Sequence, residues 1–335
     1  LAYQGLMRIR ARRCRPGMVA LAEVANRNVE QFTSGDLGFC IGPRLNAAGR
    51  LDNMSIGVEL LLADDMLKAR EFALDLDQLN QMRKEIEAGM KLEALEICQN
   101  LTALFKELPS GITLYQPDWH QGVLGIVSSR IKEQYHRPVI AFAKDGEGIL
   151  KGSARSIEGL HMRDVLERIH SQHPNMILKF GGHAMAAGLS LREEHFDDFQ
   201  HIFNQTVADW LDEEHLQGVI WTDGELNSNE FNLETAELIK SAGPWGQAFP
   251  EPCFDGEFKI LDQRAIGQNQ NHLKMLVEPK QGGPLLDAVA FNIDTRLYPD
   301  LSIKQARFAY KLDVNEFRGN RNVQLLVEYI EAIDE

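Results

Sequence analysis

The chain is poor in cysteine, and its four cysteines are far apart. Cys14, Cys40, Cys98 and Cys253 form no CxxC pair and show no spacing typical of zinc ligands. The sequence therefore predicts neither a disulfide framework nor a structural zinc site. Free thiols are typical of proteins in a reducing compartment, so we expect a cytoplasmic location.

Long apolar runs are also missing. No stretch approaches the roughly 18 apolar residues that a membrane-spanning helix needs, so no membrane association is expected. The basic start, residues 1–13, lacks the apolar centre and the cleavage site of a signal peptide. Position 1 is not an initiator methionine, and we interpret the chain as beginning partway through a longer protein. Its 335 residues suggest two or three domains.

Positive charge is scarce overall. The 35 Lys and Arg residues are outnumbered by 49 Asp and Glu residues, which gives a net charge of −14 and argues against a broad basic surface for nucleic acid. The distribution is uneven, because residues 1–50 hold eight basic and three acidic residues, whereas residues 213–335 hold 11 basic and 21 acidic ones. A binding site for a polyanion is therefore expected near the N-terminal part or in a local groove.

The first third of the chain has the pattern of helices. Residues 1–63 predict short helices separated by glycine loops, with residues 35–53 mostly loop and a helix over 55–65 that Ser55 caps. Residues 65–108 place apolar residues at helical spacing and lack proline. We expect one long helix there, and a break near Gly89 is left open.

The remainder predicts an α/β unit followed by a β domain. Strand and helix patterns alternate over residues 110–210, which favours a mostly parallel sheet covered by helices, with Asp118 capping a helix from about His120. From residue 217 short strands dominate, which favours a small barrel. The expected strands are 111–116, 138–144, 148–156, 218–226, 253–267, 272–279, 284–292, 307–317 and 322–330, and the expected helices are 120–136, 161–171, 195–211 and 232–243.

Two glycine-containing clusters in the first half could bind phosphate. GPRLNAAGR (42–50) places Arg44, Asn46 and Arg50 among small residues, and the planar fork of arginine suits phosphate. A tightly packed loop with surface arginines is the alternative. DWHQGVLGIVSSR (118–130) places His120 near a helix start, where an anion is favoured. A structural histidine is the alternative there.

Three further clusters are candidates for phosphate contact. LKGSARS (150–156) offers Ser153 and Arg155 at a strand end, although an ordinary strand exit has the same composition. KFGGHAMAAG (179–188) allows a turn that presents a histidine, which can bind phosphate or move a proton, although a hydrogen-bonded turn histidine is the alternative. NEFRGNRNVQL (315–325) is a basic hairpin, for which a solvated turn is equally compatible. The residues of interest in the last two clusters are Gly181, Gly182, His183, Arg318 and Arg321.

The order of these clusters resembles the RecJ family of the DHH phosphoesterase superfamily. The resemblance covers essentially the whole chain and rests on GPRLNAAGR, the long helix, HQGVLGIVSSR, GSARS, GGHAMAAG and a C-terminal β domain. Ala154 departs from the family's GSGRS pattern. The resemblance implies an α/β protein with a remnant of the DHH domain (1–63), a connecting helix (64–108), a DHH-associated α/β domain (109–212) and an OB-fold domain (213–335).

The resemblance also implies an activity. RecJ-type enzymes are 5′→3′ exonucleases for single-stranded DNA in repair and recombination, with two Mn²⁺ or Mg²⁺ ions held by aspartate motifs and a DHH triplet. None of these motifs occurs in the chain, so we expect no complete metal site and a substrate-gripping portion that is inactive alone. By resemblance, Ser153, Arg155 and an arginine from 42–50 hold the terminal 5′ phosphate, and His183 is expected as a catalytic residue beside the scissile group.

Partners and alternatives follow from the same resemblance. It implies a monomer that works on the 5′ end of single-stranded DNA with single-strand-binding protein and a RecQ-type helicase. A non-catalytic scaffold related to RecJ is one alternative. Another is a DHH-family phosphodiesterase for short oligonucleotides or cyclic dinucleotides, although such relatives generally lack the long helix and the OB extension.

Overall fold

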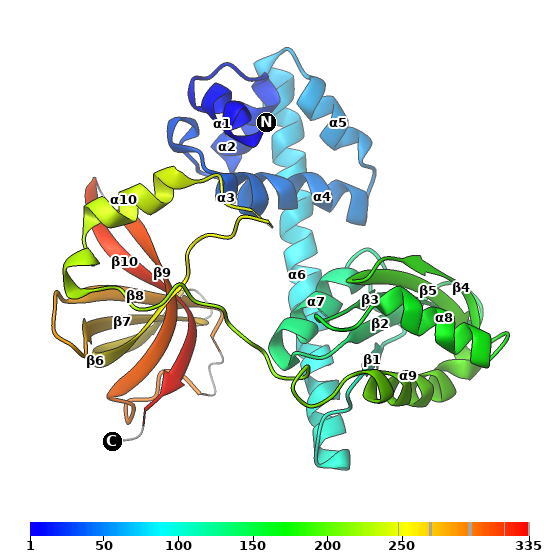
Figure 1. The fold of residues 1–335 in the computed structure, drawn as a ribbon. Coiled ribbons are helices and arrows are strands. Elements are labelled where there is room, and N and C mark those ends of the chain that lie inside the picture. Colours follow the sequence, from blue (N-terminus) through cyan, green and yellow to red (C-terminus); the bar gives the residue numbers. More distant parts are fainter. Residues whose placement is uncertain (247, 268–269, 294–296, 318, 334–335) are drawn as a thin grey trace. The chain divides into compact units, whose positions relative to one another are not determined.

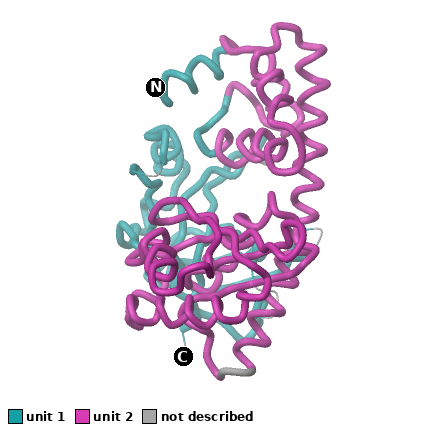
Figure 2. Tube along the Cα trace, turned by 90° about the vertical axis from the view of Figure 1, so that its right-hand side faces the viewer, with its two compact units in different colours: residues 1–11, 31–35, 219–335 teal, residues 12–30, 36–218 magenta. Residues whose placement is uncertain are grey.

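A computed structural model of the chain describes residues 1–246, 248–267, 270–293, 297–317 and 319–333 (Figure 1). The chain divides into two compact units (Figure 2). Unit 1 comprises Leu1–Ala11, Gln31–Gly35 and Val219–Glu335, and unit 2 comprises Arg12–Glu30 and Asp36–Gly218. None of the helices in the described part is both long and apolar enough to cross a membrane.

The longest element of unit 2 is the helix α6 (Met66–Phe105), which has 40 residues. Asp65 caps it by accepting from the backbone N–H groups of Leu67 and Lys68. The helix continues through Gly89, because a glycine inside a helix costs only about 1 kcal/mol and does not by itself break it. The shorter helices α2 (Pro16–Val24), α4 (Gly42–Leu51) and α5 (Ser55–Leu62) pack against α6.

The segment expected to be a glycine loop, residues 35–53, is mostly helical. A π-helical turn η2 (Leu37–Ile41) leads directly into α4. Pro43 falls in the first turn of α4, where its missing N–H costs no hydrogen bond, and Ala47 and Ala48 are completely buried. Small residues therefore serve close helix packing here rather than turns. The other short helices are α1 (Ala2–Arg10), η1 (Val29–Gln31), α3 (Ser34–Asp36), η3 (Glu193–His195) and η4 (Ser228–Glu230).

The expected cap of α5 is also different. Ser55 is the first residue of the helix, not its cap. Met54 occupies the cap position and makes no side-chain hydrogen bond there, while Asn53 Oδ1 accepts from the backbone N–H of Ser55 at 2.9 Å and from its hydroxyl at 2.7 Å.

The sheet of unit 2 has five strands, in the order β1-β2-β3-β5-β4. Only β1 and β2 are parallel, and the other three neighbouring pairs are antiparallel, so the expectation of a mostly parallel sheet was wrong. For β2–β3 and β4–β5 the reason is loop length, because residues 145–148 and 183–185 are too few for the crossover that a parallel pair requires. The strands are β1 (Ile112–Tyr115), β2 (Val139–Lys144), β3 (Ile149–Arg155), β4 (Ile177–Gly182) and β5 (Ala186–Arg192).

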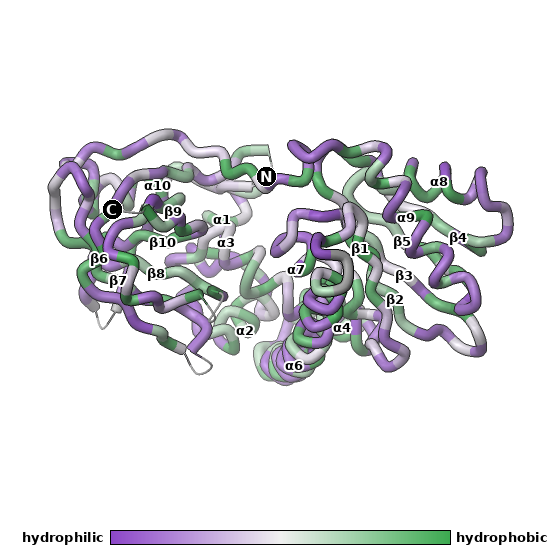
Figure 3. Tube along the Cα trace, turned by 90° about the horizontal axis from the view of Figure 1, so that it is seen from below, coloured by the Kyte–Doolittle hydropathy of each residue, from purple (hydrophilic) through white to green (hydrophobic). Residues whose placement is uncertain are grey.

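Three helices complete the sheet of unit 2. Helix α7 (Leu124–Tyr135) packs against β2, β3 and α6, whereas α8 (Met162–Gln172) and α9 (Phe196–Trp210) lie on the other face (Figure 3). Helix α7 begins at Leu124, not near His120, and Asp118 does not cap it. Residues before it form a turn instead, in which the Val123 N–H donates to the His120 carbonyl.

Unit 1 contains the predicted small barrel. Five strands close in the order β10-β8-β7-β6-β9, and α10 (Leu233–Ala242) packs on β9 and β10. Residues 218–226 are not a strand, although they are rich in β-forming residues; Val219, Ile220 and Trp221 are exposed there. The strands are β6 (Phe254–Ile266), β7 (His272–Pro279), β8 (Leu286–Phe291), β9 (Gln305–Phe317) and β10 (Asn320–Ala332).

Candidate nucleic-acid interface

Two arginines from distant parts of the sequence meet the same short segment of unit 2. Arg50, at the end of α4, donates from Nη1 to the carbonyl of Gly122 at 2.9 Å. Gly122 in turn packs on the Arg50 backbone so closely that a Cβ would lie 2.1 Å from the Arg50 carbonyl oxygen. Arg155, at the end of β3, lies against Gly125, where a Cβ would be 2.6 Å from Arg155 Nη2. Glycines at 122 and 125 are therefore what allow both arginines to reach the start of α7.

Ser153 completes this group. Its hydroxyl lies 3.4 Å from Arg155 Nη1, and a Cβ on Gly125 would lie 3.0 Å from the same hydroxyl. Arg155 Nη1 also donates to the carbonyl of Ala154 at 2.7 Å, which fixes the guanidinium over the end of β3. Ser128 of α7 donates to the Ser153 carbonyl at 2.8 Å and holds the helix on the strand. One hydroxyl and two guanidinium groups thus surround the first turn of α7.

The electrostatics of this group favour an anion. Burial lowers the pKa of Arg50, and the positive charge of Arg83 lowers it further, against the opposing effect of Glu87. Burial also lowers the pKa of Arg155, and the charge of Arg50 adds to that effect. Among the described residues, no Asp or Glu lies within ion-pair distance of Arg50 or Arg155. Two half-buried cations without a carboxylate partner are a favourable place for a phosphate.

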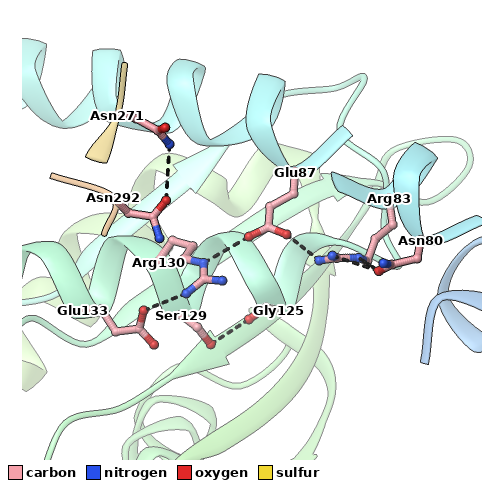
Figure 4. Close-up of polar contacts among 9 residues, drawn as sticks. All are labelled: Asn80, Arg83, Glu87, Gly125, Ser129, Arg130, Glu133, Asn271 and Asn292. Carbon is pink, nitrogen blue, oxygen red and sulfur yellow. Dashed lines mark hydrogen bonds and ion pairs between the residues drawn. The ribbon is translucent and has the colours of Figure 1, made fainter. Parts of the chain in front are cut away.

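A polar network holds α6 to α7 beside these arginines (Figure 4). Glu87 of α6 accepts from Arg83 Nη1 and, at 3.0 Å, from Arg130 Nε of α7. Asn80 Oδ1 accepts from Arg83 Nε and Nη2 at 3.3 and 3.1 Å. These residues are not among those predicted from the sequence. The helical spacing of 80, 83 and 87 indicates local pairs, but the approach of Arg130 is a tertiary contact.

We expect Glu87→Gln to destabilise unit 2 by about 3 kcal/mol, because it leaves Arg83 nearly buried without a counter-charge. The side chains of Arg83 and Glu87 are 11% and 13% exposed, so solvent compensates little. The measurement is the thermal unfolding midpoint. Glu133→Gln is the matched control, since the Arg130–Glu133 pair is half exposed and worth only about 0–1 kcal/mol. Equal effects of the two substitutions would contradict a structural role for Glu87.

The turn between β4 and β5 brings His183 towards the same edge of the sheet. Gly182 has a φ of +149°, and a Cβ there would lie 2.4 Å from the Ala186 carbonyl oxygen. The His183 N–H donates to that carbonyl at 2.8 Å, and Ala186 lies directly opposite Arg155 in the β3–β5 register. His183 and Arg155 are thus about two strand spacings, roughly 10 Å, apart. His183 is exposed.

The other predicted site residues are arranged differently. Arg44 is engaged within the protein, since Nε lies 2.8 Å from Asp77 Oδ1 and Nη1 donates to the Cys40 carbonyl. Asn46 and His120 are exposed, and His120 Nδ1 accepts from the Gly122 N–H at 3.1 Å. Gly181 is exposed on β4.

The basic hairpin of unit 1 is already partly neutralised. Arg321 forms ion pairs with Glu237 at 2.8 Å and Glu316 at 3.9 Å. Arg318 lies outside the described residues. Within the described part of the chain, no group of three or more His, Cys, Asp or Glu side chains could hold a metal ion.

Known protein families match two parts of the chain. Residues 104–209 match the DHHA1 domain, and residues 222–329 match the RecJ OB domain. These ranges correspond to the α/β sheet with its helices and to most of the barrel region.

Curated relatives match the chain along its whole length. A single-stranded-DNA-specific exonuclease RecJ of Haemophilus influenzae is 90% identical over 100% of this chain and 58% of the relative. The RecJ of Escherichia coli is 58% identical over 98% of this chain and 57% of the relative. The chain therefore spans a little more than half the length of these relatives.

Solved structures agree with the sequence comparison. The crystal structure of Thermus thermophilus RecJ in complex with Mn²⁺ has a TM-score of 0.76 at 25% identity, covering 99% of this chain and 46% of that one. Identity over the whole chain, both domain matches and this similarity of fold agree: the chain belongs to the RecJ family and corresponds to the C-terminal portion of its members.

Proposed function

We propose that the chain grips single-stranded DNA for a RecJ-type enzyme that degrades the strand from its 5′ end. The observation that carries the proposal is the pair Arg50 and Arg155, which lie half buried against Gly122 and Gly125 and form no ion pair with a carboxylate among the described residues. The names of the relatives, single-stranded-DNA-specific exonucleases, support the choice of DNA as the anion.

In this proposal the terminal 5′ phosphate binds between Arg50, Arg155 and the Ser153 hydroxyl. Arginine binds phosphate through two parallel N–H donors, which gives both strength and orientation. The first turn of α7 directs its N–H groups and its dipole to the same place. Arg44 is a poorer candidate, because its Nε and Nη1 already hold Asp77 and Cys40.

His183 is assigned to the scissile phosphate group. It is exposed at the end of β4, about two strands from Arg155, and an imidazole can hold or transfer a proton near neutral pH. The closed barrel would hold the strand further along, as OB folds do. Because residues 213–335 are acidic overall, that contact is expected to be a narrow groove.

Divalent metal ions belong to the proposed reaction but not to this part of the enzyme. Thermus thermophilus RecJ is known in complex with Mg²⁺ and with Mn²⁺. Such ions activate water and stabilise charge on the scissile phosphate. The described residues offer no carboxylate or histidine group that fits them, so we assign hydrolysis to the full-length enzyme and binding to this chain.

This division predicts no exonuclease activity for the 335-residue chain. The measurement is the release of nucleotides from single-stranded DNA in the presence of Mn²⁺. Full-length RecJ of Haemophilus influenzae, 90% identical over this region, serves as the positive control. Robust degradation by the chain itself would contradict the division.

Binding tests the proposed function directly. We expect the chain to bind a 5′-phosphorylated oligonucleotide about 10-fold or more tightly than the same strand with a 5′ hydroxyl, since hydrogen bonds to charged groups are worth about 1.5–3 kcal/mol. Fluorescence anisotropy with a 3′-labelled strand measures both affinities without any metal. Equal affinities would overturn the assignment of a 5′-phosphate site.

A further inference from the structure

Three neighbouring strands of unit 2 contain no acidic residue. Strands β3, β4 and β5 carry Lys151, Arg155, Lys179 and Arg192 but no Asp or Glu. The whole chain has a net charge of −14, so an all-basic group of strands stands out against its composition. Arg155 belongs to the 5′-phosphate site already described, and the other three cations have no role there.

The register of the strands places all four cations on one face of the sheet. Lys151 lies opposite Ser190, and Ser190 lies opposite Lys179. Arg192 is two residues further along β5 and therefore points to the same side as Ser190. The alternate residues point to the other side, where they form the core with α8 and α9: Leu150, Ala154, Ala187, Leu189 and Leu191.

This basic face is open where the lysines lie. Lys151, Lys179 and Arg192 are exposed, whereas the residues on the face that α8 and α9 cover are buried. Between the cations the floor is glycine: a Cβ on Gly181 would meet nothing within 4 Å, and one on Gly188 would meet only the Gly152 carbonyl oxygen at 3.8 Å. The backbone of β4 and β5 is therefore open to a ligand at Gly181 and Gly188.

We propose that Lys151, Lys179 and Arg192, here called the open-face strip, bind internal backbone phosphates of the same single strand. The inference rests on the proposed function and extends it, because it names a second set of contacts beyond the 5′ phosphate. Arg155 is four positions along β3 from Lys151, which corresponds to about 13 Å. The strip therefore contacts phosphates further along the strand than the terminal one.

The chemistry of the strip predicts binding without sequence preference. Lysine presents a flexible point charge that suits a phosphate and does not read base edges in a fixed geometry. Among the described ion pairs, none neutralises Lys151, Lys179 or Arg192. The nearby Lys144 is different, since it pairs with Glu193 at 3.4 Å and is left out of the strip.

The test compares salt dependence for two ligands. The double variant Lys151→Gln/Lys179→Gln is titrated with a 5′-phosphorylated dinucleotide and with a 5′-phosphorylated strand of about 12 nucleotides. For the long strand we expect affinity to fall and the slope of log K against log salt to become shallower by about 1.4, or about 0.7 for each lost contact. For the dinucleotide we expect no change, because it reaches only the Arg50–Arg155 site.

A matched control separates the strip from general charge effects. Lys84→Gln/Arg163→Gln removes two exposed cations from α6 and α8, outside the three strands that carry the strip. We expect this variant to keep the wild-type salt slope for both ligands. Circular dichroism of each variant checks that the fold is intact.

The possible outcomes distinguish the two proposals. If the double variant and its control have the same slope, while Arg155→Ala still weakens binding of the phosphorylated end, the strip is overturned and the proposed function stands. If the double variant makes the salt slope shallower, but neither Arg155→Ala nor removal of the 5′ phosphate changes the affinity, the strip stands and the 5′-phosphate site is overturned. If the wild-type chain binds neither ligand, both proposals fail.

Discussion

Arg155→Ala is expected to remove most of the preference of the chain for a phosphorylated 5′ end. Arg155 is half buried and its Nη2 faces Gly125. Burial, and after it the positive charge of Arg50, lower its pKa, so a bound phosphate relieves a repulsion as well as forming hydrogen bonds. Losing a charge-assisted contact of this kind costs about 1.5–3 kcal/mol, or about 10- to 100-fold in affinity. Fluorescence anisotropy with 5′-phosphate and 5′-hydroxyl strands measures the effect.

Two further variants sharpen this experiment. Arg163→Ala removes an exposed arginine from α8. This variant should prefer the phosphorylated end as strongly as the wild-type chain does. Arg155→Lys keeps the charge but loses the planar fork, so an intermediate preference is expected. A wild-type preference in Arg155→Ala would show that Arg155 does not hold the 5′ phosphate.

Gly182→Ala is expected to cost about 3 kcal/mol or more of stability and to displace His183. The residue has a φ of +149°, a conformation almost restricted to glycine, and its Cβ would lie 2.4 Å from the Ala186 carbonyl oxygen and 2.5 Å from the Ala187 Cα. Because both contacts are to backbone, no side-chain rotation relieves them. The thermal unfolding midpoint measures the loss.

The neighbouring glycine provides the control. A Cβ on Gly181 would meet nothing within 4 Å, and alanine is favoured over glycine in a strand by roughly 0.5–1 kcal/mol. Gly181→Ala should therefore leave the unfolding midpoint unchanged or raise it slightly. Comparable losses for the two substitutions would contradict the backbone conformation described for this turn.

Local patterns predicted most elements of the fold. Helical spacing identified α6, α8 and α9, and runs of β-forming residues identified β1, β2, β3 and the five strands of the barrel. The predicted direction of the strands was wrong, because most neighbouring pairs are antiparallel. The four-residue loop 145–148 already indicated this for β2 and β3, since it is too short for a parallel crossover. The prediction of a loop over residues 35–53 was wrong. Glycine also occurs in helices where packing is close, and proline occurs in their first turn.

Some of the predicted site residues lie together in the structure, and others do not. Arg50, Ser153 and Arg155 were selected because arginine and small residues suit phosphate, and the structure brings these three together. Arg44 was selected on the same grounds, yet its side chain holds Asp77. Composition could not separate the two arginines of α4, because they differ only in what lies beside them in space.

The sequence by itself determined the family, most of the secondary structure and the chemistry of the candidate site residues, because periodicity and motif order are local properties of the chain. Only the tertiary structure decided which cations are available to an anion. Arg50 reaches Gly122, 72 positions away, and the register of β3, β5 and β4 places Lys151 and Lys179 on one open face. The physical reason is that charge acts through space: whether an arginine binds a ligand or braces a helix depends on which carboxylates the fold places beside it.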